Sequence, residues 1–99
     1  MAYYLVTAKP LNDLQPLKLE LDQGEIKVMR PFGLALDHSL NNARRAEGGW
    51  ITWEEEDYCS PPLAQERAAV LDRYFVELSV VKVTRDEGWK QIDHLSKLW

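Results

Sequence analysis

The sequence lacks the residues on which several classes of protein depend. Its 99 residues include one cysteine, so the chain cannot close an internal disulfide, and this usage is typical of a reducing, cytoplasmic setting. The histidines and the cysteine do not fall at the spacings of known metal sites, and no glycine loop that cradles phosphate is present. We expect no cofactor and no metal, although the acidic residues leave open a cation held by oxygens alone.

Charge and hydropathy further limit the kinds of partner that the chain can bind. Acidic residues outnumber basic ones by 16 to 12, a formal net charge of −4, and the only adjacent basic pair is Arg44-Arg45. This balance argues against nucleic acid, which needs a basic surface. No apolar stretch approaches the length of a membrane span, and the N-terminus lacks the pattern of a secretory signal. We expect one soluble domain over residues 1–99, in the cytoplasm and without a membrane partner.

The least ordinary chemistry lies in residues 50–59, which predict a strand. Alternate residues of a strand share a face; one face here would carry Ile51, Trp53, Glu55, Asp57 and Cys59. If the two large apolar residues pack into a core, Glu55 and Asp57 also point inward, with Cα atoms about 7 Å apart. Buried carboxylates are costly unless they are paired, hydrogen-bonded or open to a cleft, and such conflicts occur at functional sites.

A second interpretation makes these acids ordinary surface residues. A run of four acidic residues is typical of a strand end that leaves the core and enters water, and a bulge after Trp53 would turn the acids outward. The sequence leaves both interpretations open.

The residues after this strand predict a long helix. Ser60 is a preferred N-cap and Pro61 suits the first helical position, so we expect a helix over residues 61–75. Its apolar stripe would hold Leu63, Val70, Leu71 and Tyr74, with polar residues such as Glu66 mostly elsewhere.

The first third of the chain predicts two strands and a segment that can be read in two ways. Aromatic and β-branched residues predict a central strand over residues 3–8, and the pattern of residues 25–30 predicts a short one. Between them, Asn12 and Gly24 have the character of helix caps, which favours a helix. The alternating leucines in the same segment also allow a hairpin.

The later segments complete the pattern. Pro31 can open an amphipathic helix that ends at Gly48-Gly49. Residues 76–84 predict a strand in which both faces are covered or a bulge near Val80 shifts the register. The tail, residues 86–99, is polar with spaced apolar residues, and we expect it to dock on the body or on a partner subunit.

This order of elements predicts an α+β fold. Two main helices on one face of an antiparallel sheet of about four strands form the ferredoxin-like sandwich, here with a short extra helix and a docked C-terminal tail.

Two short segments occupy places known from a protein family. Gly24-Glu25-Ile26 stands where that family turns from its first helix into its second strand, and Asp72-Arg73-Tyr74-Phe75 ends the second helix, where the family often shows Asp-Pro and an aromatic. The chain thereby resembles the YCII-like family within the dimeric α+β barrel superfamily. It departs from the family in lacking the histidine of the first helix and in having Arg73 in place of proline. The resemblance implies the fold and a homodimer, and no catalytic residue is carried over.

Seven residues are candidates for chemistry or binding. Glu55 and Asp57 are the candidate catalytic pair, by acid–base chemistry. The candidate binding residues are Trp53, Tyr58, Cys59, Arg30 and His38. The helix that follows would lower the pKa of the Cys59 thiol and the carboxylates would raise it, so without a nearby cation such as Arg30 the thiol is an inert apolar group. His38 suits a general base near neutral pH, but it falls off its apolar stripe, as a surface histidine does.

Two functions follow as hypotheses. In the first, a homodimer binds a small molecule in a cleft near Trp53, Glu55 and Asp57. In the second, a non-catalytic protein binds another protein through its Trp-rich tail and the acidic strand end. An apolar patch should then be exposed near Trp89 and Trp99, with the acids at its rim.

Overall fold

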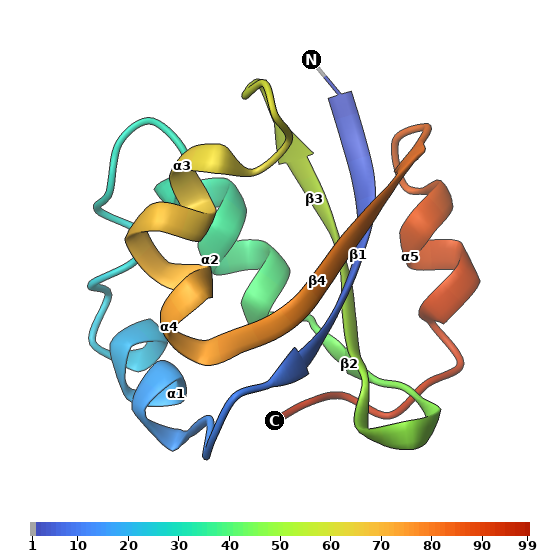
Figure 1. Ribbon diagram of the computed structural model, residues 1–99, viewed down its shortest axis with the longest axis horizontal. Helices are drawn as coiled ribbons and strands as arrows, with labels where there is room; N and C mark the ends of the chain where they lie inside the picture. The colour runs from blue at the N-terminus through green and yellow to red at the C-terminus, as the bar shows by residue number, and fades with distance from the viewer. Residues whose placement is uncertain (1) are drawn as a thin grey trace.

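The computed structural model describes residues 2–99 as an antiparallel sheet with helices on both sides (Figure 1). The elements in chain order are β1 (Ala2–Pro10), α1 (Gln15–Asp22), α2 (Gly33–Asn41), β2 (Arg44–Arg45), η1 (Glu47–Gly49), β3 (Ile51–Asp57), α3 (Ala64–Glu66), η2 (Arg67–Leu71), α4 (Asp72–Tyr74), β4 (Phe75–Val83) and α5 (Glu87–Ile92). The segments α3, η2 and α4 follow one another without a break, and the middle one is a π-helix. We call residues 64–74 the second long helix.

The sheet has the strand order β2-β3-β1-β4, and each neighbouring pair is antiparallel. The aromatic and β-branched residues of β1 suit its central position, where both edges are paired. In its pairing with β3, Val6 lies opposite Trp53 and Ala8 opposite Ile51, so four apolar side chains leave the same face. The prediction of an α+β chain with a four-stranded antiparallel sheet is confirmed.

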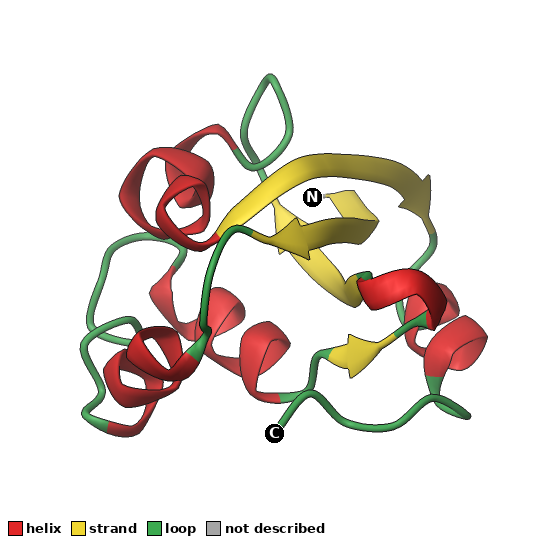
Figure 2. Cartoon of the chain, turned by 60° about the horizontal axis from the view of Figure 1, so that its bottom comes forward, coloured by secondary structure: helices red, strands yellow, loops and turns green. Residues whose placement is uncertain are grey.

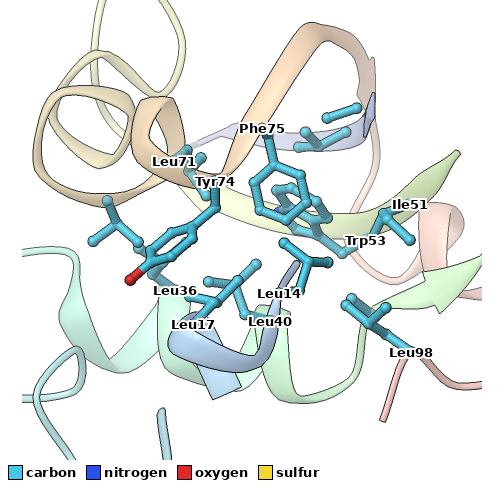
Figure 3. Packing of buried hydrophobic residues seen from close by; sticks show 14 of the residues in the cluster. Leu14, Leu17, Leu36, Leu40, Ile51, Trp53, Leu71, Tyr74, Phe75 and Leu98 are labelled. Carbon is cyan, nitrogen blue, oxygen red and sulfur yellow. The ribbon is translucent and has the colours of Figure 1, made fainter. Parts of the chain in front are cut away.

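That apolar face forms the core together with α1, α2 and the second long helix (Figure 1). Trp53 is fully buried at its centre, and its ring lies 5.2 Å from that of Phe75, centroid to centroid. Figure 3 shows Leu14, which precedes α1, together with Leu17 of α1 and Leu40 of α2, on the helical side of this pair of rings. Burying a large side chain completely is worth about 1.5–3 kcal/mol, so Trp53 holds the inner face of β3 in place.

The opposite face of β3 and β1 is covered by α5. Here Glu54, although buried, is fully satisfied: its Oε1 accepts from the N–H of Gly88 at 2.8 Å and its Oε2 from the N–H of Asp86 at 2.9 Å. A carboxylate at a helix start satisfies N–H groups that no helical carbonyl reaches. A Cβ at Gly88 would lie 3.0 Å from Glu54 Oε1, so the close approach favours glycine.

The last residues run beside β2, as Figure 2 shows, and pack on the body. Leu98 is buried and its N–H donates to Ala43 O at 2.9 Å. The indole N–H of Trp99 donates to Leu40 O at 2.9 Å.

Residues 25–30 form turns, so the strand predicted there is wrong. Ile26 is fully buried while Val28 is 67% exposed, so the two residues do not share a covered face. The helix predicted to run from Pro31 to Gly48-Gly49 begins at Gly33 and ends at Asn41 instead. It begins tightly against these turns: a Cβ at Gly33 would lie 2.4 Å from Ile26 O.

The second long helix begins at Ala64, three residues later than predicted, and Ser60 does not cap it. Leu63, just before it, adopts a left-handed backbone with φ 64°. Its N–H donates to Asp57 Oδ2 at 2.6 Å. The carboxylate that satisfies the start of this helix therefore comes from the end of β3.

Two open alternatives are decided by the structure. The segment after β1 is a helix, α1, and Gly24 follows it with φ 75°, as a C-terminal glycine does. The strand over residues 75–83 carries a register shift, because Thr7 pairs with Ser79 but Lys9 pairs with Val76. The irregularity lies just before the predicted position, where Glu77 has φ 52°.

Replacing Glu54 with alanine removes the acceptor for the N–H groups of Asp86 and Gly88 and leaves that of Gly88 buried against β3. We expect a loss of about 1–3 kcal/mol in the free energy of unfolding, measured in urea at pH 7. Hydrogen exchange at the Gly88 amide should become faster. Glu25→Ala, at an exposed position, is the control, and equal stability of the two variants would contradict this role for Glu54.

Candidate functional site

A cluster of two carboxyls and one thiol forms where β3 meets the second long helix. Asp57 is the last residue of β3, Cys59 follows in the connection, and Glu66 comes from the first turn of the helix. One side-chain ligand atom of each lies within 4.8 Å of those of the other two. We call these three residues the acid–thiol cluster.

Glu66 is the member that the sequence analysis missed, because it was placed off the apolar stripe of its helix. It is fully buried. Its position three residues after Leu63 and four before Val70 puts it on the stripe with these two buried residues. An acid at such a position was the available signal. The helix widens into a π-helical segment directly after Glu66, a deviation that is frequent at functional sites.

Glu55 lies behind the cluster and is fully buried. Its Oε1 accepts from the indole N–H of Trp53 at 3.0 Å, while Oε2 has no hydrogen-bond partner within residues 2–99. Burial, followed by the charge of Glu66, raises the pKa of Glu55 well above its usual value. Both effects favour the protonated form of Glu55. The sequence left open whether Glu55 and Asp57 point inward or into water. Both side chains are buried, as the inward interpretation expects.

The pKa values of Asp57 and Glu66 move in opposite directions. Burial alone would raise the pKa of Asp57, but hydrogen bonds from the N–H of Leu63, from Glu66 and from nearby backbone outweigh it and lower the pKa. Burial, together with the hydrogen bond and charge of Asp57, raises the pKa of Glu66 to about 7. Two carboxyls can hydrogen-bond only through a proton, so Glu66 carries that proton and Asp57 is the anion.

Cys59 is a neutral thiol in this environment. A backbone hydrogen bond near Gln65 lowers the pKa of Cys59, but burial and the charges of Asp57 and Glu66 outweigh it and raise the pKa. Its Sγ lies 3.9 Å from Glu66 Oε1. None of the ion pairs formed among residues 2–99 involves the cluster, so no cation offsets its negative charge there.

The cluster opens on a cavity of about 320 Å³. One wall is apolar and is formed at and before the start of α2, and the other is polar and is formed by the end of β3 and the second long helix. The apolar wall holds Pro31, Phe32, Leu34 and Ala35, and the polar wall holds Glu56, Asp57, Tyr58, Cys59, Gln65 and Glu66. Few convergent polar groups facing an apolar wall are typical of small-molecule sites.

The other candidate residues lie in different places. Trp53 is in the core and supports Glu55 without lining the cavity. Tyr58 lines the cavity but is 71% exposed, and its hydroxyl donates to Glu56. Arg30 is exposed and does not line it. His38 is exposed on α2 and borders a separate hollow, where its ring meets that of Trp89 edge to face.

A larger hollow, of about 820 Å³, lies at the other end of the sheet beside Trp50 and Trp99. Its cations already have partners: Arg45 donates to Leu98 O at 2.8 Å, and Lys18 pairs with Asp22 at 3.0 Å. The acid–thiol cluster, with its unpartnered carboxyl oxygen, is the stronger candidate for chemistry.

Comparison of the chain with protein-family models, with curated proteins and with solved structures found no match in any of the three. The resemblance to the YCII-like family and to the dimeric barrels therefore has no support from a family match. Within residues 2–99, no helix has the length and apolar character to cross a membrane.

A proton shared by Asp57 and Glu66 makes the stability depend on pH. The pKa of Glu66 is raised on folding from 4.5 to about 7, so its stabilising contribution is complete below 4.5 and is lost as the pH rises through 7. Glu66→Gln mimics the protonated form. In urea unfolding we expect it to match the parent at pH 5 and to exceed it by at least about 1 kcal/mol at pH 8.

The exposed Glu25→Gln serves as the control for this pH series. A Glu66→Gln difference that stays constant from pH 5 to pH 8 would contradict the shared proton.

Proposed function

We propose that the chain binds a small molecule in the cavity beside the acid–thiol cluster and exchanges a proton with it through Glu66. The observation that carries the proposal is the place of Glu66: its carboxyl, with a pKa of about 7, stands in the wall of a cavity whose opposite wall is apolar. A group whose pKa lies near the working pH serves as both acid and base. The class of function is acid–base chemistry on a bound molecule, or its recognition by protonation.

The walls of the cavity favour a ligand of two parts. An apolar body would pack against Phe32 and Ala35, and a hydrogen-bond donor such as an amine would meet the carboxyls. Glu66 Oε2 receives no hydrogen bond within residues 2–99, so a donor on the ligand would satisfy it. Asp57, kept ionised by the N–H of Leu63, would attract a cationic group.

The finer parts of the fold prediction are proposals as well. The strand order β2-β3-β1-β4 with antiparallel neighbours supports the ferredoxin-like arrangement. A homodimer and a cytoplasmic location stay predictions. Because α5 covers β3 and β1 on the face where dimeric barrels pack their sheets, β4 offers the accessible surface for a second copy, with Val81 62% exposed.

The alternative function, protein binding through the tail, has less support. It needs an exposed apolar patch near Trp89 and Trp99, but both side chains are partly buried against the core. The hydrogen bond from Trp99 to Leu40 holds the end of the tail on the body.

Filling the cavity should abolish binding of small molecules. In Ala35→Phe the new ring would occupy the space between the apolar wall and the carboxyls, whereas Ala68→Phe, on the exposed side of the second long helix, adds the same ring elsewhere. We expect fragments with an apolar ring and an amine, found by saturation-transfer NMR with the parent, to lose their signal with Ala35→Phe and to keep it with Ala68→Phe. Equal signals from both variants would place the fragments outside the cavity.

The pH dependence of binding tests the role of Glu66. Benzylamine stays cationic between pH 5.5 and 8, so its affinity should rise as Glu66 ionises, with a midpoint at about 7. The Kd from NMR titration should fall by about tenfold across this range, since one charge contact is worth about 1–2 kcal/mol in a partly buried site. Glu66→Gln should flatten the profile. A parent profile that is already flat would leave binding without proton exchange.

A further inference from the structure

We propose that the acid–thiol cluster is a site for a divalent cation of the zinc class, held by Asp57, Cys59 and Glu66. The three side chains converge from β3, the connection after it and the second long helix, and their ligand atoms lie within 4.8 Å of one another. This goes beyond the proposed function, because cation binding does not require the small molecule.

An acidic cluster alone would not carry this inference, but the state of Glu66 is a second observation. The side chain is fully buried, and apart from the proton that Glu66 shares with Asp57 its Oε2 meets no hydrogen-bond partner within residues 2–99. Leaving a buried carboxyl oxygen unpaired costs free energy. This oxygen belongs to a side chain that lines the cavity together with Asp57 and Cys59, so a cation there would satisfy it.

The ligand set selects the kind of cation. Zn²⁺ accepts a thiolate together with carboxylate oxygens, whereas Ca²⁺ and Mg²⁺ prefer oxygen alone. Around a tetrahedral ion with bonds of about 2.0–2.3 Å, neighbouring ligand atoms lie roughly 3.3–3.8 Å apart. The separation of 3.9 Å between Cys59 Sγ and Glu66 Oε1 is already close to this range.

The surroundings of the three ligands suit a zinc site that keeps one coordination position open. The N–H of Leu63 fixes the Asp57 carboxylate, the kind of outer contact that orients metal ligands. Three protein ligands leave the fourth position of a tetrahedral ion free, and it would face the cavity. A water or a donor atom of a bound molecule would take that place.

Binding exchanges protons for the cation. A cation of this class binds the deprotonated forms of thiol and carboxyl groups, so any protons on these ligands must leave. Binding of Zn²⁺ forms one Zn–S and two Zn–O bonds, and the S–H and O–H protons pass to the buffer. The affinity should therefore rise with pH.

The sequence predicts no metal site, because the familiar spacings of His and Cys are absent. The ligands here stand two and seven residues apart in the order Asp57, Cys59, Glu66, and only the turn between strand and helix brings them together.

The test uses the full chain, freed of metal with EDTA and dialysed. Titration with ZnCl₂ by calorimetry should show one site, and Co²⁺ in its place should give a sulfur-to-cobalt charge-transfer band. Cys59 is the only cysteine, so that band reports this site alone. Cys59→Ser should abolish the band, and both Cys59→Ser and Glu66→Gln should weaken Zn²⁺ binding at least about tenfold, while the exposed His94→Ala should bind as the parent does.

The outcomes separate this proposal from the proposed function. Circular dichroism establishes that each variant is folded. Zn²⁺ is titrated without benzylamine, and benzylamine after treatment with EDTA, so either measurement can fail while the other succeeds. Absence of binding by the folded parent, binding unchanged in Cys59→Ser, or equal affinity for Ca²⁺ and Zn²⁺ would overturn the zinc site. None of these results bears on the binding of benzylamine to the metal-free chain.

Discussion

The pleat of β3 is the constraint on which the rest of the site depends. Side chains two residues apart on a strand share a face, so burying Trp53 in the core also turns Glu55 and Asp57 inward. A slip of the strand register by one residue would turn Trp53 toward the opposite face and turn Glu55 and Asp57 out of the core. The pairing of Val6 with Trp53 in the centre of the sheet prevents that slip, because it would turn the apolar side chains of both strands away from each other.

Three buried acids of β3 are stabilised by their surroundings in three different ways. Glu54, on the opposite face, is satisfied by N–H groups at the start of α5. Burial raises the pKa of Glu55, and its carboxyl accepts a hydrogen bond from the Trp53 indole. Asp57 keeps its charge because the N–H of Leu63 stabilises it. Acids of one strand thus differ in their chemistry because their environments differ, and the third lines the cavity of the acid–thiol cluster.

Irregular backbone gathers at that same cavity. Leu63 adopts a left-handed conformation at 0% exposure, and the helix widens into a π-helical segment beyond Glu66. Such deviations persist where the surrounding packing holds them, and they are frequent near sites that bind or react. The negative charge has no ion pair within residues 2–99, so the place gains most from a ligand that brings positive charge: a proton, an amine or a cation.

Local patterns by themselves determined the class of fold and two of the three residues of the acid–thiol cluster. The strands β1 and β3 were predicted from their composition and from the proline and glycine residues that bound them. The alternation in residues 50–59 placed Asp57 and Cys59 on one face. They failed at residues 25–30, where Ile26 enters the core from a turn. Glu66 was missed because an acid was expected off the apolar stripe of its helix.

Only the tertiary structure decided that the acids face inward, that Glu66 meets Asp57, and that Arg30 and His38 lie elsewhere. These facts depend on where the second long helix begins and on how it docks against the end of β3. A carboxylate from the strand, rather than the cap beside it in sequence, sets that start. Contacts between elements fix the distances among polar groups, and those distances set the pKa values of the groups. The periodicity of a sequence contains information on neither the distances nor the pKa values.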